Sequence, residues 1–318
     1  MSVDCHDPLP VVRVDQIPQE ENTQRWLVEE LWGDSSVGVI GGAPKCSKTW
    51  LGLDLALSVA TGTACLGRYA VPRPGPVLIY LAEDALPVVR ERVEGMARHR
   101  GLDLIGVEIH VITAPSLRLD REPHREKLLE TAKRLRPRLL LLDPLVRLHS
   151  LDENDARQVA ELLAYFRLLQ RRLDLSVILV HHTRKNAAGG VAAGQGLRGS
   201  GDLHAFGDSN LYLRRTQQRL VLLSEHRAAP AAPAVTLELV TTDGAAPHLE
   251  VVGAESPSDR HGNLREQVLA CLVPGGALTR ARLRDLLSVQ NQHLGEVLET
   301  LERAGEIRRS PAGWQRVD

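Results

Sequence analysis

Gly42-Ala43-Pro44-Lys45-Cys46-Ser47-Lys48-Thr49 is the stretch of this 318-residue chain that decides its fold. It follows the phosphate-binding P-loop pattern of Gly, four free residues, then Gly-Lys-Ser/Thr, except that Ser47 replaces the second glycine. An apolar run from Val37 to Ile40 precedes the loop, and an amphipathic helix closed by Gly62 follows it. This strand, loop and helix context favours binding of phosphate oxygens by backbone N–H groups and a helix N-terminus. A glycine-rich turn that binds nothing is the alternative.

The loop residues have distinct expected roles. Lys48 is expected to place a positive charge at the β- and γ-phosphates of ATP, and Thr49 to offer its hydroxyl to Mg²⁺. Ser47 stands where a helix opens, a position that favours serine, so we interpret it as tolerated variation. We interpret Cys46 as a passive filler, with an oxidation-sensitive point as the alternative. The residues expected to bind the nucleotide are Gly42, Ala43, Pro44, Lys45, Cys46, Ser47, Lys48, Thr49 and Trp50.

Composition narrows the class of protein. Hydrophobic residues make up 43% of the chain and charged residues 25%, as in ordinary soluble globular proteins. The net charge of -1 excludes a global basic field, so any DNA contact must come from local patches. No apolar run reaches the roughly 18 residues of a membrane span, and the N-terminus does not resemble a signal peptide. The four cysteines form no CxxC pair, which argues against a zinc site and favours a cytoplasmic protein.

Apolar runs and helical stretches alternate from Val37 to about Val252. The runs are continuous rather than alternating, which is typical of parallel strands buried on both faces. The pattern predicts a doubly wound α/β fold with a mainly parallel sheet, extended after Gly201 by antiparallel strands at one edge. We expect a lead-in segment at residues 1–35, the α/β domain at 36–253, a linker at 254–262 and a small domain at 263–318.

The C-terminal segment predicts three helices and a hairpin, an arrangement that resembles a winged helix-turn-helix. Its second helix carries Arg280, Arg282 and Arg284, and its third begins with polar side chains that could reach base edges or phosphates. Glu296 and its acidic neighbours on the third helix leave the alternative that this domain binds a protein partner.

Two strand ends supply the acids that ATP hydrolysis needs. Leu139 to Asp143 is an apolar run that ends in a carboxylate, the Walker B pattern, and Asp143 is expected to hold Mg²⁺ together with Thr49. Glu83 follows the strand after the P-loop helix and is the candidate base that positions the attacking water. Asp84 is interpreted as a cap of the next helix. The alternatives are a turn-capping role for Asp143 and a surface-loop role for Glu83.

Taken in order, these motifs resemble the RecA-fold ATPases of the hexameric plasmid-helicase (RepA-type) group. The resemblance covers roughly residues 20–225 and implies a RecA-like ring that uses ATP and Mg²⁺ and acts on single-stranded DNA. The motifs that carry it are Gly42–Thr49 with the helix that follows, Tyr80–Asp84, Leu142–Leu148, Val180–Lys185 and Leu197–Gly201.

The resemblance implies further roles. His182, at a strand end, would sense the γ-phosphate, unless it only satisfies strand-end backbone. The glycine-rich stretch Thr183–Ser200 would line the channel and contact DNA phosphates, or else be a surface loop; its cations are Arg184, Lys185 and Arg198. Arg214 and Arg215 are candidates for the positive side chain that completes a neighbouring subunit's site. A helicase-like motor is the leading hypothesis, with a nucleotide-gated DNA-binding regulator or a recombination accessory protein as alternatives.

Overall fold

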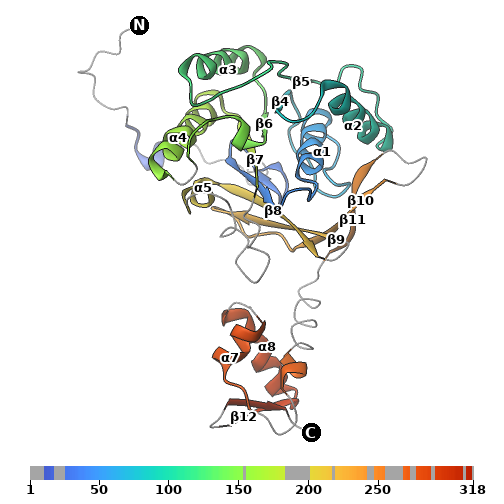
Figure 1. The fold of residues 1–318 in the computed structure, drawn as a ribbon, viewed down its shortest axis with the longest axis vertical. Coiled ribbons are helices and arrows are strands. Elements are labelled where there is room, and N and C mark those ends of the chain that lie inside the picture. Colours follow the sequence, from blue (N-terminus) through green and yellow to red (C-terminus); the bar gives the residue numbers. More distant parts are fainter. Residues whose placement is uncertain are drawn as a thin grey trace.

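The computed structural model describes residues 11–17, 26–152, 155–182, 201–216, 219–241, 247–254, 268–272, 277–287, 291–310 and 313–316. Within these ranges a nine-stranded sheet forms the centre of the molecule (Figure 1). Its strands are β3 (Val37–Gly42), β4 (Val77–Leu81), β5 (Ile109–Val111), β6 (Leu139–Asp143), β7 (Ser176–His182), β8 (Ser209–Thr216), β9 (Arg219–His226), β10 (Val235–Val240) and β11 (His248–Ala254).

The strand order is β11-β10-β9-β8-β3-β7-β6-β4-β5. The strands from β8 to β5 pair in parallel, whereas β8, β9, β10 and β11 pair antiparallel. The predicted fold class, a mainly parallel α/β sheet with antiparallel strands at one edge, is therefore confirmed.

Helices cover both faces of the parallel part (Figure 1). One face carries α1 (Lys48–Thr61) and α2 (Leu86–His99), and the other carries α3 (Glu122–Leu135), α4 (Ala156–Leu173) and α5 (Gly201–Phe206). Side chains of each strand alternate between the two layers: Leu139 and Leu141 pack on the α1 side, Leu140 and Leu142 on the α4 side. Burial on both faces explains the uninterrupted apolar runs of the sequence.

The lead-in contributes to this core. A short antiparallel pair, β1 (Trp26–Val28) and β2 (Trp32–Gly33), precedes β3. Leu27 and Trp32 are completely buried in the cluster that also contains the α1 side chains. The end of the predicted lead-in segment is thus an integral part of the packed α/β unit.

The C-terminal elements have a hydrophobic cluster of their own, and Figure 1 shows them apart from the large sheet. They are α7 (Arg280–Leu287), α8 (Asn291–Arg303) and a hairpin of β12 (Ile307–Ser310) and β13 (Gly313–Arg316). Leu278 and Trp314 exchange two backbone hydrogen bonds of 3.0 and 2.8 Å, so a single β-bridge joins the chain before α7 to the hairpin. The second and third predicted helices and the hairpin are present, and residues 264–267 of the first lie outside the described residues.

Candidate nucleotide-binding site

The sheet topology brings four strand ends to one edge. In the register of the parallel strands, Gly42 lies opposite His182, and Leu81 lies opposite Asp143. The P-loop strand β3 is separated from β6 by β7 alone, and β4 follows β6. Because the carboxyl ends of parallel strands meet at the same edge, the loop, both strand-end acids and His182 come together there.

A cavity of about 390 Å³ occupies this edge. Its lining includes most of the residues predicted for the site. It also includes Asp84, Arg92 and Leu239, which were not predicted to line it. The lining residues are Lys45, Cys46, Ser47, Lys48, Thr49, Trp50, Glu83, Asp84, Arg92, Asp143, His182, Arg215 and Leu239.

Lys48 opens α1 and is buried, with 5% of its surface exposed. Its Nζ donates to the carbonyl oxygens of Gly42 at 3.1 Å and Ala43 at 2.8 Å. Burial lowers the pKa of Lys48, partly offset by the nearby Cys46 and Asp143. Burial also raises the pKa of the Cys46 thiol, whose Sγ lies 3.8 Å from Nζ. The two carbonyls hold the ammonium in place, and phosphate oxygens offer it stronger, charged acceptors.

Ser47 differs from its expected role. It is the residue before α1, but its φ of 62° and ψ of 26° are left-handed, and its side chain makes no capping hydrogen bond. The interpretation that serine is favoured here as a helix cap is therefore wrong. The loop turns through the left-handed region that glycine occupies without strain, so Ser47 carries the backbone cost that the usual glycine avoids. Lys45 shares this geometry, with a φ of 62°.

Thr49 and Asp143 meet as the Walker B prediction requires. The Thr49 hydroxyl donates to Asp143 Oδ2 at 2.7 Å. Burial raises the pKa of Asp143 to about 6, against the lowering effects of the Thr49 hydrogen bond and of Lys48. A hydroxyl and a carboxylate are oxygen ligands of the kind Mg²⁺ takes, and a cation would offset the cost of burying this charge. The residues present therefore fit a magnesium ion.

The two acids after β4 are each bound by an arginine. Arg147 Nε donates to Glu83 Oε1 at 2.7 Å, and Arg92 donates to Asp84 Oδ2 at 2.8 Å. The predicted capping role of Asp84 is wrong, because the residue before α2 is Ala85 and Asp84 instead pairs with Arg92 from within that helix. The Arg92 guanidinium also lies over the Trp50 ring, 5.4 Å from its centroid.

The remaining predicted residues are placed as follows. Arg215 donates to the Lys45 carbonyl at 3.2 Å, so it lies at the P-loop of its own chain. Arg214 is its neighbour on β8, pairs with Val221 in the strand register, and does not line the cavity. The predicted DNA contacts Arg184, Lys185 and Arg198 lie outside the described residues.

Sequence reasoning missed Arg92, Arg147 and Leu239. Arg147 lies in a short 3-10 turn, η3 (Leu145–Arg147), directly after β6, and Arg92 lies two turns into α2. Arg92 lies only eight residues after Asp84, and this spacing could have suggested their pair. Arg147 lies 64 residues after Glu83, and the pairing of β4 with β6 brings the two together. Leu239 comes from β10, and nothing in the sequence near the P-loop points to it.

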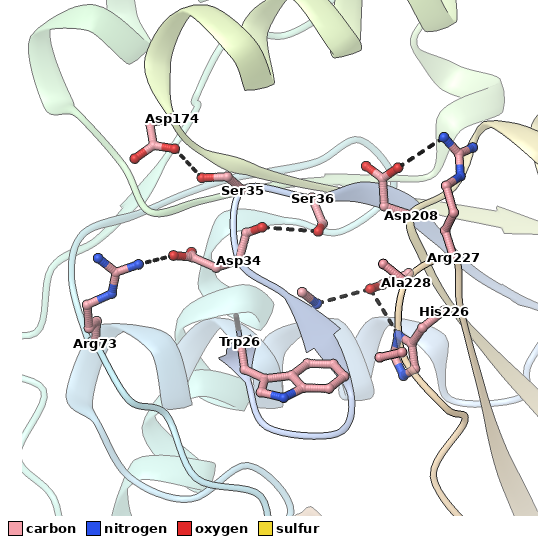
Figure 2. A pocket seen from close by; sticks show the side chains of 13 residues that line it. Trp26, Asp34, Ser35, Ser36, Arg73, Asp174, Asp208, His226, Arg227 and Ala228 are labelled. Carbon is pink, nitrogen blue, oxygen red and sulfur yellow. Dashed lines mark hydrogen bonds and ion pairs between the residues drawn. The ribbon is translucent and has the colours of Figure 1, made fainter. Parts of the chain in front are cut away.

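A second cavity lies at the opposite edge, where the parallel strands begin (Figure 2). Its carboxylates are held by guanidinium groups and hydroxyls of neighbouring elements. Asp34 pairs with Arg73 and with Arg138, and Asp208 pairs with Arg167 and with Arg227. These pairs tie the starts of β3 and β8 to the surrounding loops and helices, which is a structural role.

In the described residues no helix has both the length and the apolar character of a membrane span. The same residues contain no group of three or more histidine, cysteine or acidic side chains that could hold a metal ion. Magnesium at Thr49 and Asp143 would therefore share its coordination with phosphate oxygens and water.

Comparison with known proteins agrees with the geometry. No curated protein matches the chain. The model of a family described as AAA domain, AAA_25, matches residues 5–188, a span that includes the P-loop, Glu83, Asp143 and His182. Because the match covers more than half of the 318 residues, the chain belongs to this family of P-loop ATPase domains.

Proposed function

We propose that this protein hydrolyses ATP with Mg²⁺ and couples hydrolysis to DNA, as a ring-forming RecA-fold motor related to the plasmid helicases. One observation carries the catalytic part: Lys48, the Thr49–Asp143 pair and Glu83 line one cavity at the carboxyl edge of the sheet. Each supplies a different requirement of phosphoryl transfer, namely charge at the phosphates, metal ligands and a base for water.

In this proposal each side chain has its own role. Lys48 would give up its hydrogen bonds to the carbonyls of Gly42 and Ala43 and donate to phosphate oxygens instead. Thr49 and Asp143 would hold a magnesium ion, which would supply charge neutralisation. Glu83 accepts a hydrogen bond from the attacking water and orients it for in-line attack. His182 lies opposite Gly42 in the sheet and would donate to a phosphate oxygen in this proposal. Arg215 adds a positive charge at the P-loop.

The C-terminal unit supports a contact with DNA. Arg280, Arg282 and Arg284 are exposed on α7, and Arg308 and Arg309 are exposed on the β12 strand of the hairpin. Helices with a basic surface beside a hairpin suit binding to phosphates and a groove. The strand-like pairing of Leu278 with Trp314 is consistent with a winged helix.

The exposed arginines of the C-terminal unit also favour a second candidate function, that of a nucleotide-gated DNA-binding regulator. In the described part of the chain these exposed arginines belong to the C-terminal unit rather than to the cavity edge. Strand displacement on a forked duplex separates the candidates, because only the motor unwinds it. Binding of one duplex sequence without unwinding would favour the regulator.

The catalytic proposal is tested by the Lys48→Ala variant. We expect ATP turnover to fall by at least ~10²-fold, because a preorganised charge at the phosphates is lost. Lys133→Ala, on α3 with its Glu130 partner, is the matched control and should leave turnover unchanged. Turnover is measured without DNA, with single-stranded DNA and with duplex DNA. Unchanged turnover in the Lys48 variant would refute the site, and stimulation by neither DNA would refute the coupling to DNA.

A further inference from the structure

Two histidine rings lie face to face where α2 meets the last strand of the sheet. His99 is the final residue of α2, and His248 is the first residue of β11. Their ring centroids are 3.4 Å apart, and their planes are inclined by only 16°. His248 is buried, with 7% of its surface exposed, whereas His99 is exposed. Because like charges at this separation repel, the stack is stable only while the two rings are not both charged.

The charged groups around the stack come from three elements. Arg100 follows His99 at the end of α2, Glu250 lies two residues after His248 on β11, and Asp54 of α1 pairs with Arg100 at 2.6 Å. Desolvation of the stacked ring, the neighbouring His248 and Arg100 lower the pKa of His99, and Glu250 and Asp54 partly offset this lowering. The two rings are coupled groups, so the stack accepts one proton more readily than two.

The stack joins two elements that both reach the nucleotide-binding cavity. In the described sheet β11 is an edge strand paired with β10, and its other face packs against the α1 and α2 side of the core (Figure 1). Arg92 of α2 lines the cavity, and so does Leu239 of β10. Leu239 is next to Val240, the residue opposite His248 in the strand register. A change at the stack can therefore reach the cavity from both sides.

We propose that His99 and His248 form a pH-sensitive joint, which holds α2 against the β10–β11 pair while the rings are uncharged and loosens when acid charges both. A histidine whose pKa is lowered by folding stabilises the folded protein above its ordinary titration range, at about pH 6.5. This stabilisation is lost as the pH falls below that range. The joint is independent of the proposed function, and only its effect on nucleotide binding rests on that function.

Thermal unfolding of the wild type and of His99→Phe at pH 7.5 and 5.5 tests the joint. Phenylalanine keeps a ring against His248 but cannot take a proton, and EDTA keeps transition metals from the imidazoles. Between the two pH values we expect the Tm of the wild type to fall by roughly 2–5 °C more than that of His99→Phe. This range corresponds to about a tenfold loss of proton affinity at one imidazole.

His110→Phe is the matched control. His110 lies on β5, and in the described part of the chain it takes part in none of the ring contacts. This variant should show the pH dependence of the wild type. Equal pH dependence in all three proteins, or the same relief in His110→Phe as in His99→Phe, overturns the inference.

An NMR titration of the wild-type protein gives a second measurement that needs no variant. The two imidazole rings are assigned by the through-space contact between their C–H groups. We expect them to titrate in two coupled steps, the second of them below the range of an ordinary histidine. Two independent titrations in the ordinary range would contradict the joint.

Binding of ADP with Mg²⁺ separates the joint from the proposed function. From pH 7.5 to 5.5 we expect Kd to rise more for the wild type than for His99→Phe, by up to about tenfold, because a loosened joint withdraws Arg92 and Leu239 from the cavity. If the Tm values differ as expected but neither protein binds the nucleotide, the joint stands and the proposed function is wrong. If both proteins bind it and their Tm values change alike, the joint is wrong and the nucleotide site stands.

Discussion

Replacing Asp143 with asparagine should stabilise the metal-free protein at neutral pH while abolishing its magnesium-dependent turnover. Burial raises the pKa of Asp143 from 3.8 to about 6 in the folded state. A carboxyl whose folded pKa lies above its unfolded pKa opposes folding once the pH exceeds the unfolded value. This penalty grows as the pH rises from about 4 to about 6 and is complete above that. A shift of about two pKa units corresponds to about 3 kcal/mol.

Asparagine has nearly the same shape and keeps an oxygen that accepts the Thr49 hydroxyl, but it has no charge to bury. Asp143→Asn should therefore raise the free energy of unfolding by about 3 kcal/mol at pH 7.5 in EDTA, and by about half as much at pH 5. For a domain of this size, that gain at pH 7.5 corresponds to roughly 6–12 °C in Tm.

Thermal unfolding at the two pH values measures this effect. Asp103→Asn removes an exposed carboxylate and controls for the loss of one negative charge. Added Mg²⁺ and ATP should stabilise the wild-type protein more than Asp143→Asn, because the metal requires the ionised ligand. The reasoning fails if Asp143→Asn is no more stable than wild type at pH 7.5, or if its advantage does not shrink at pH 5.

Two further predictions concern the P-loop. Ser47→Gly should stabilise the protein by about 1 kcal/mol, because glycine adopts the left-handed conformation of this residue without strain, although the greater entropy of the unfolded chain removes part of the gain. Ser47→Ala should not stabilise the protein, and denaturant unfolding of both variants measures the difference. Arg215→Ala should raise KM for ATP by roughly ten- to a hundredfold, the range for a hydrogen bond to a charged group, while Arg214→Ala should not; steady-state kinetics would contradict the assignment if both variants behaved alike.

Much of the fold follows from local sequence patterns. Strands buried on both faces give apolar runs such as Leu139–Leu142. The helices between them end one or two residues before Gly62, Gly101 or Pro137, so the order and type of these elements can be predicted. The β1–β2 pair was not predicted. Its strands are too short to show a period, and the burial of Trp32 depends on a hydrophobic cluster assembled from distant parts of the chain.

Some residues of the candidate site could likewise be predicted from local sequence patterns, whereas others could not. The P-loop, Asp143 and Glu83 are recognisable because each lies at the end of an apolar run, and strand ends converge by topology. Leu239 reaches the cavity only because β10 packs at the far edge of the sheet, a contact across some 190 residues. The left-handed conformation of Ser47 could not be predicted for a different reason. Serine is a common helix cap, and only the backbone angles show the strain at this position.

The charged side chains at the two edges of the sheet differ in whether their charges are balanced within the chain. At the amino edge, Asp34 and Asp208 each lie against two arginines, so their charges are matched within the chain. At the carboxyl edge, Lys48 donates to backbone carbonyls and Asp143 accepts from a hydroxyl, so neither hydrogen bond balances the charge. Burial shifts the pKa of both groups towards their neutral forms. A ligand that brings phosphate to the lysine and a cation to the aspartate balances both charges at once, and magnesium with ATP is such a ligand.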